Sequence, residues 1–143
     1  MTVNGSNFEI KLAGIYSHVF EGRKFTQFAL DYTDEICGRC GTPPNYKRIL
    51  LNINSDALES IEGTYDLSQY ESELRNMSGG YYLSGYPIYL YAGLVTVTKL
   101  GDARYKLEFN GVKGRFYLNE SSPTDIEGYF DGDFTTLENR FWD

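Results

Sequence analysis

The chain has 143 residues and a formal net charge of −7, with 41% hydrophobic and 23% charged residues. This length is typical of a chain that buries one core of its own, so we expect a single domain over residues 1–143. The acidic balance, without a cluster of Lys and Arg, argues against binding to nucleic acid or to an anionic membrane surface.

Aromatic residues are unusually frequent, at 16% of the chain, with 13 Tyr and 9 Phe. Because tyrosine, phenylalanine and threonine favour strands, the composition predicts a β-rich domain. The sequence contains no apolar run of about 18 residues, so we expect no transmembrane helix. Its first residues, "MTVNGSNFEIKL", resemble no targeting segment. The protein is therefore cytoplasmic, or a targeting segment has been removed from it.

Apolar and polar residues alternate with a period of two along most of the chain. The first segments with this pattern are residues 8–12, 26–32 and 47–53. Such alternation is typical of strands that bury one face and expose the other.

A short helix is expected to follow. Asp66 and Gln69 form a capping box at its start, and Gly79-Gly80 would end it. Beyond it, residues 86–100 predict one long strand, or two strands joined at Gly93, where the glycine suggests a bulge or bend.

The segment "ARYKLEFNGVKGRFYL", residues 103–118, predicts a β-hairpin. Asn110-Gly111 is a favoured turn pair because both positions take a positive φ. The turn would place Phe109 opposite Val112, with both side chains on one face of the hairpin.

The last predicted strand covers residues 125–134. Its inner face would carry Ile126, Phe130 and Phe134, and Tyr129 lies on the outer face. The outer face also carries four acids: Asp125, Glu127, Asp131 and Asp133. They could bind calcium, but alternate residues of a strand lie about 7 Å apart, so we favour cross-strand pairing with Lys106, Lys113 and Arg115.

These elements predict an all-β (minor α) fold with about eight strands and one short helix. An antiparallel β-sandwich and a small β-barrel both fit this pattern, because periodicity does not distinguish them.

Cys37 and Cys40 are the only cysteines and lie in the stretch "ICGRCG". A redox pair would place the first thiol at a helix N-terminus, whereas the following "GTPPNY" predicts a turn. A structural zinc site needs four ligands, and His18 is the only histidine. We therefore favour a disulfide across a tight loop, with free thiols and a metal or redox site as alternatives.

No motif of the chain indicates catalysis. His18 lies between Tyr16 and Phe20 in a strand pattern, which favours packing or surface exposure over a catalytic role. Phosphate-binding loops and dinucleotide fingerprints do not occur, so we expect no cofactor and no enzyme. A hydrolase with paired carboxylates is the enzymatic alternative.

Five tyrosines in "GGYYLSGYPIYLYAG" are the candidate binding residues: Tyr81, Tyr82, Tyr86, Tyr89 and Tyr91. They cannot all be interior, and exposed tyrosines suit a protein interface or the apolar face of a sugar. The alternative is that they only cover the sheet.

The segments "RILLNINSDALESIEGTYDLSQY", "YAGLVTVTKLGDARYKLEFNGVKGRFY" and "DIEGYFDGDF" lie within residues 48–134 and carry short strand and turn motifs. In these motifs the chain resembles small Bacteroidetes lipoproteins and related β-rich domains of unknown function. The resemblance implies export and a lipid anchor outside the given chain, although the chain itself has no signal peptide or lipobox. It also implies an oxidising compartment, which agrees with a disulfide between the cysteines.

We therefore predict a non-enzymatic binding domain in the periplasm or at the cell surface, with a glycan or a protein as its partner. The alternative is a cytoplasmic acidic inhibitor or immunity-type protein that blocks a basic partner.

Overall fold

A computed structural model of the chain describes residues 1–32, 47–55, 60–69, 77–83, 86–116 and 119–136. These residues form eleven strands and one short 3-10 helix, η1. Their bounds are β1 Thr2–Val3, β2 Ser6–Asn7, β3 Leu12–Phe20, β4 Arg23–Asp31, β5 Lys47–Asn54, β6 Gly63–Asp66, η1 Leu67–Gln69, β7 Met77–Leu83, β8 Tyr86–Lys99, β9 Arg104–Phe116, β10 Asn119–Asp133 and β11 Thr135–Thr136.

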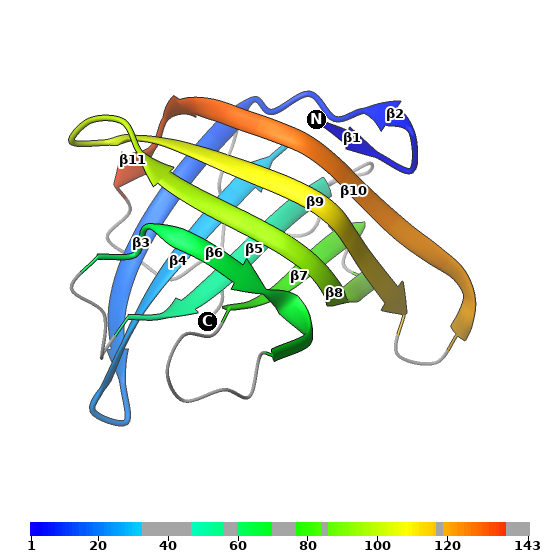
Figure 1. The fold of residues 1–143 in the computed structure, drawn as a ribbon, viewed down its shortest axis with the longest axis horizontal. Coiled ribbons are helices and arrows are strands. Elements are labelled where there is room, and N and C mark those ends of the chain that lie inside the picture. Colours follow the sequence, from blue (N-terminus) through cyan, green and yellow to red (C-terminus); the bar gives the residue numbers. More distant parts are fainter. Residues whose placement is uncertain (33–46, 56–59, 70–76, 84–85, 117–118, 137–143) are drawn as a thin grey trace.

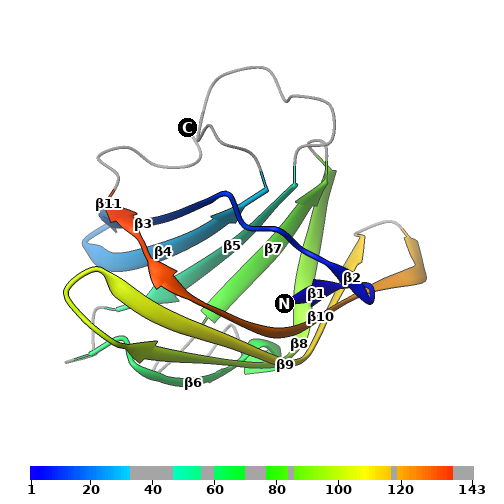
Figure 2. The same cartoon turned by 90° about the horizontal axis from the view of Figure 1, so that it is seen from above.

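All strands belong to a single curled sheet that forms an open half-barrel (Figures 1 and 2). The order of neighbouring strands in the sheet is β3, β4, β5, β7, β8, β9 and β10. At the other edge of β10, β1 pairs with β10 and β2 pairs with β1. The all-β prediction is confirmed, and one curled sheet corresponds to the barrel alternative. More strands are present than predicted because β1, β2 and β11 have only 2 residues each.

The two sides of the half-barrel meet at one corner. β10 ends at Asp133, and after Phe134 the chain continues as β11, where Thr135 pairs in parallel with Gly14 of β3. Phe134 is buried, and its ring makes edge-to-face contacts with Phe28 and Tyr105 at centroid distances of 5.2 and 5.7 Å. This aromatic cluster holds β11 against the core.

The core lies on the inner face of the sheet. Its members alternate along the strands, as the period of two predicts. Phe28 and Leu30 of β4 and Ile49 and Leu51 of β5 are fully buried there. Burial of each such side chain contributes about 1.5–3 kcal/mol.

The outer face of β4 and β5 is buried as well, contrary to the prediction of half-buried strands. It holds an ion pair in which Arg48 donates from Nε and Nη2 to the two carboxylate oxygens of Asp31, at 2.6 and 2.9 Å. The side chains of Asp31 and Arg48 are 0% and 1% exposed. Burial raises the pKa of Asp31, and the hydrogen bond and charge of Arg48 oppose this shift.

The predicted hairpin at Asn110-Gly111 is wrong. β9 runs through both residues, and its partners are β8 on one side and β10 on the other. Asn110 and Gly111 instead form a β-bulge, because the pairing shifts register here on both sides of β9. Phe109 and Val112 are both buried on the inner face, so the predicted face is right.

Three glycines with positive φ mark this bend across three adjacent strands: Gly93 of β8, Gly111 of β9 and Gly128 of β10. A side chain at Gly93 would overlap the backbone of Gly111. Glu127 of β10 accepts a hydrogen bond from the Gly111 N–H at 2.8 Å. The bulge or bend predicted at Gly93 is thereby confirmed.

At the start of the predicted helix the structure has the 3-10 turn η1. Asp66 caps this turn, because its carboxylate accepts hydrogen bonds from the backbone N–H and the hydroxyl of Ser68, which lower the pKa of Asp66. Residues 70–76 lie outside the described part. Gly79 and Gly80 do not end a helix but lie in β7, where a side chain at Gly79 would meet those of Leu51 and Leu90 at 3.0 Å.

The strand predicted over residues 8–12 is also misplaced. Residues 8–11 connect β2 to β3, which begins at Leu12. Phe8 is buried, while Glu9 and Lys11 are exposed. The apolar and polar residues therefore alternate here because this connecting segment packs on the core with one side, although it is not a strand.

Candidate binding surface on strands β8 and β9

Tyr81, the first candidate tyrosine, belongs to the core. In β7 it pairs with Ile49 of β5, whose side chain faces inward, and it is only 5% exposed. Its ring meets Phe8 edge to face at a centroid distance of 6.3 Å. Burial raises the pKa of the Tyr81 hydroxyl. Tyr81 therefore does not contribute to an exposed binding surface.

Tyr82 and Tyr86 lie on the two strands that flank the β7–β8 connection. Their backbones pair with Pro87 and Leu83, respectively. The side chains of these two tyrosines lie outside the described part of the structure.

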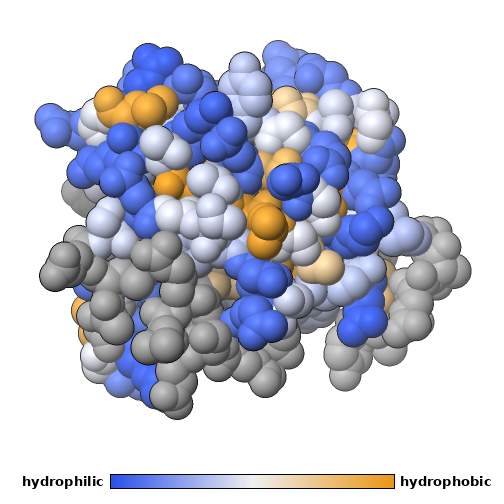
Figure 3. All heavy atoms as spheres, viewed as in Figure 1, coloured by the Kyte–Doolittle hydropathy of each residue, from blue (hydrophilic) through white to orange (hydrophobic). Residues whose placement is uncertain are grey.

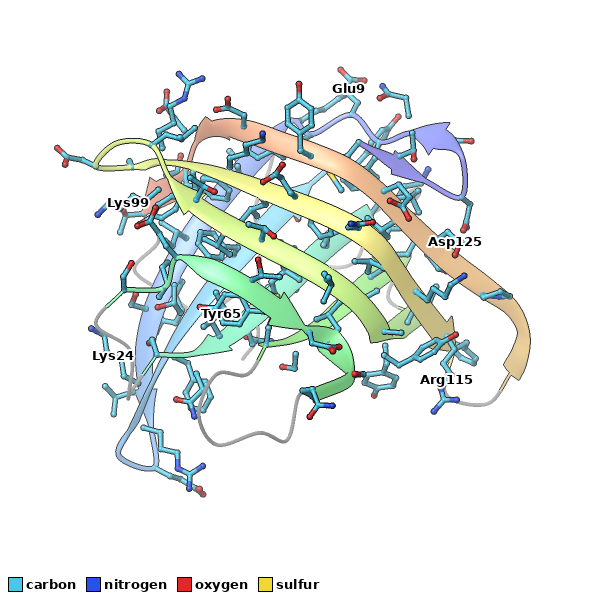
Figure 4. The ribbon with its side chains drawn as sticks, in the orientation of Figure 1. Glu9, Lys24, Tyr65, Lys99, Arg115 and Asp125 are labelled. Atoms are coloured by element: carbon cyan, nitrogen blue, oxygen red, sulfur yellow. The ribbon has the colours of Figure 1, made fainter. Side chains whose placement is uncertain are left out.

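Tyr89 and Tyr91 of β8 lie on the outer side of the sheet, beside Arg115 of β9. Tyr89 is opposite Arg115 in the register and is 50% exposed. The guanidinium carbon of Arg115 lies 4.9 Å from the ring centroid of Tyr91. These three residues, the Tyr89–Arg115 surface, are the side chains that the structure brings together from the candidate region. Figure 4 shows Arg115 near the end of β9.

The sheet irregularity explains how Tyr91 reaches Arg115. Leu90 pairs with Gly114 but Ala92 pairs with Lys113, so Tyr91 is an extra residue in β8. Such a bulge increases the local twist and changes the direction of the side chain. A cation–π contact of this kind contributes about 0.5–1 kcal/mol at an exposed site.

The face around this surface is mixed in character. Figure 3 shows separate apolar areas among hydrophilic residues, viewed with β8 and β9 toward the reader. Leu94 of β8 is 40% exposed, and Lys113 of β9 is 51% exposed. The described residues of this face do not form a broad apolar patch.

Two of the four acids on the outer face of β10 form ion pairs across strands, and only that of Asp125 has a predicted base, Lys113, as its partner. Asp125 lies 3.2 Å from Lys113, and Asp131 lies 3.0 Å from Arg104. The partner of Asp131, Arg104, was not predicted.

The other two predicted bases make other contacts: Lys106 pairs with Glu108 of its own strand at 3.3 Å, and Arg115 contacts Tyr91. In the described part of the chain, His, Cys, Asp and Glu side chains do not gather in groups of three or more that could hold a metal ion.

The remaining candidates cannot be placed in this surface. Cys37 and Cys40 lie outside the described residues, so their predicted disulfide stays a prediction. His18 pairs with Phe25 through its backbone in β3, and its side chain lies outside the described part.

Arg115 is the residue of this surface that the tyrosine pattern did not indicate. A turn near Leu100 joins β8 to β9, and the pairing of the two strands then places Arg115 beside Tyr89. The misplaced hairpin concealed this signal, since it paired Arg115 with Lys106.

No helix among the described residues is long and apolar enough to cross a membrane. In comparisons with known proteins, no family model, no curated protein and no solved structure matches this chain.

Proposed function

We propose that this chain is a non-enzymatic binding domain that takes a glycan or a protein at the Tyr89–Arg115 surface. The observation that carries the proposal is the half-exposed ring of Tyr89 next to Arg115, which lies over Tyr91. Exposed tyrosines and arginines are the residues that most often dominate binding energies. Both strands are hydrogen-bonded neighbours in the sheet, so we expect the backbone of this surface to need little reordering when a ligand binds.

The alternative, an acidic inhibitor of a basic partner, would use the outer face of β10. Asp125, Glu127, Asp131 and Asp133 are all exposed there. Lys113 and Arg104 already pair with Asp125 and Asp131, however, and this lowers the negative charge that β10 can offer. We therefore prefer the Tyr89–Arg115 surface.

The first test replaces Tyr89 by alanine and applies the protein to arrays of oligosaccharides and of synthetic peptides. We expect Y89A to bind the ligands of the wild-type protein at least about tenfold more weakly, as for a tyrosine at the centre of a binding site. The matched control is Y129A, because Tyr129 is 59% exposed on β10 and has Lys106 Nζ 4.8 Å from its ring centroid. The proposal is wrong if no ligand binds, or if binding survives in Y89A and is lost in Y129A.

A further inference from the structure

One edge of β10 is open along residues 129–133. β9 pairs with the opposite edge there, whereas β1 pairs with the open edge only at residues 126–127. Figure 1 shows β1 and β2 beside β10 at a distance from the end that leads to β11. The backbone N–H groups of Phe8 and Lys11, in the segment between β2 and β3, bond to other residues than those of β10.

The backbone groups of three residues point toward this open edge. The Phe134 N–H donates to the Ala103 carbonyl, on the side of β9, at 2.7 Å. Consecutive residues of a strand point their N–H and C=O groups to opposite edges. Those of Tyr129, Asp131 and Asp133 therefore point away from β9. Within the described part of the chain these groups have no hydrogen-bond partner, so they can pair with an added strand.

The acids on this edge select a basic strand. Asp131 and Asp133 are both exposed on the outer face, and Asp131 pairs with Arg104 at 3.0 Å. Asp133 has no ion-pair partner among the described residues. An added strand would place its own side chains opposite these acids, where Lys or Arg forms cross-strand pairs. Pairing with β10 of a second copy about either acid would place that acid opposite itself, which disfavours self-association.

The inner face of the same edge favours apolar residues between the basic ones. Phe130 is partly buried against the core, and a Cβ at Gly132 would meet its ring at 2.7 Å. A residue of an added strand opposite Gly132 therefore lies next to the Phe130 ring. A segment in which basic and apolar residues alternate would match both faces, because alternate side chains of a strand share one face.

We propose that the open edge of β10 binds an extended basic segment of a partner protein, which adds to the sheet as a further strand. The segment bonds to the backbone of Tyr129, Asp131 and Asp133, and its basic side chains pair with the two acids. The edge lies at the end of β9 that carries Arg104, whereas Arg115 lies near the other end. The inference thus concerns a second surface and goes beyond the proposed function.

The test titrates a fluorescent peptide of alternating lysine and valine and follows its anisotropy. Two further peptides carry backbone N-methyl groups, one on every lysine and the other on every valine. Since consecutive N–H groups point to opposite edges, one methylated peptide should bind at least about tenfold more weakly and the other should bind like the parent. A peptide with glutamate in place of lysine should also lose at least about tenfold in affinity.

Two variants of the protein test the acids and the backbone separately. Asp133→Asn should weaken peptide binding about two- to fivefold, the scale of one cross-strand pair. Asp131→Pro removes an outward N–H, at a position where an edge strand tolerates proline, and should abolish binding. The matched control is Asp125→Asn on the same strand, because the Asp125 N–H and C=O are already bonded to Asn4 at 2.8 Å. It makes the same change of charge and should leave binding unchanged.

Thermal unfolding shows whether each variant is folded, and the methylated peptides decide alone if Asp131→Pro is not. Equal binding of both methylated peptides would overturn the inference, since charge attraction without strand addition does not distinguish them. Absence of binding by the lysine–valine peptide would overturn it as well, as would equal losses in Asp125→Asn and Asp133→Asn. Peptide binding that is lost in Y89A and kept in Asp133→Asn would overturn this inference and support the proposed function.

Discussion

Asp31 and Arg48 form the most deeply buried ion pair among the described residues. Transfer of two charges out of water costs several kcal/mol each, and a bidentate contact offsets only part of that cost. The two hydrogen bonds of 2.6 and 2.9 Å satisfy both carboxylate oxygens of Asp31. Removal of one partner leaves the other charge buried and unpaired. The resulting loss of folding free energy is therefore larger than the net contribution of the intact pair.

Replacement of Arg48 by methionine should lower the free energy of unfolding by about 3–5 kcal/mol at neutral pH. The ionised Asp31 would then be buried without a counter-charge, and its pKa would rise further above the ordinary value of 3.8. A raised pKa means that the folded state holds the proton more tightly than the unfolded chain, so stability is lost as pH rises above 3.8. The cost of R48M should accordingly shrink as the pH is lowered toward that value.

Urea unfolding of wild type and R48M over the range from about pH 4 to pH 8 measures this dependence. Arg104→Met supplies the control, because the exposed Arg104–Asp131 pair should contribute less than about 1 kcal/mol. A cost of R48M that stays constant over the whole pH range would contradict the explanation.

At the scale of elements, the bend through β8, β9 and β10 shows where local pattern reasoning fails. A two-residue turn and a β-bulge at Asn110-Gly111 both return Phe109 and Val112 to the same face of the sheet. The alternation of apolar residues is therefore identical in the two cases, and only a long-range feature separates them. That feature is the presence of Gly93 and Gly128 on the adjacent strands.

Alanine substitutions along the bend should have very different costs. At Gly111 an added Cβ meets nothing within 4 Å, so the only penalty of G111A is that alanine must adopt a left-handed backbone conformation. We expect this to lower the free energy of unfolding by about 1–2 kcal/mol. At Gly93 a side chain would overlap the backbone of Gly111 and Val112, so G93A should cost more than about 3 kcal/mol. Chemical unfolding of both variants measures the difference, and equal costs would show that the strands can separate at the bend.

The tyrosines illustrate the same limit on sequence-based prediction. Alternation places Tyr81 on one face of β7 and Tyr89 on one face of β8, but it does not say which face is inner. Pairing of Tyr81 with Ile49 answers that question for β7. The bulge at Tyr91 and the neighbouring Arg115 depend on the register between β8 and β9. The all-β class and the exposed acids of β10 were predictable, whereas the assembled surface was not.

At the scale of the whole molecule, our proposal for the compartment of the protein rests on the resemblance to lipoproteins and on the disulfide predicted between Cys37 and Cys40. We propose that the domain is exported to the periplasm or the cell surface, and we expect these cysteines to be oxidised there. Intact-mass measurement with alkylation before and after reduction tests this expectation. Alkylation only after reduction supports a disulfide. Immediate alkylation of the exported protein would refute it, and protected but unoxidised thiols would indicate metal.

The corner where β11 joins β3 also has a consequence for the order in which the protein folds. Neighbouring strands from β3 to β10 are mostly consecutive in the chain, so the curved sheet can form by adding one strand after another. β1 and β3, by contrast, find their last partners only in residues 126–127 and 135–136. Phe134 reaches its place between Phe28 and Tyr105 at the same late moment. Until residues 126–136 have paired, the aromatic interior of the sheet is exposed at one corner, so we expect their pairing to be the last step of folding.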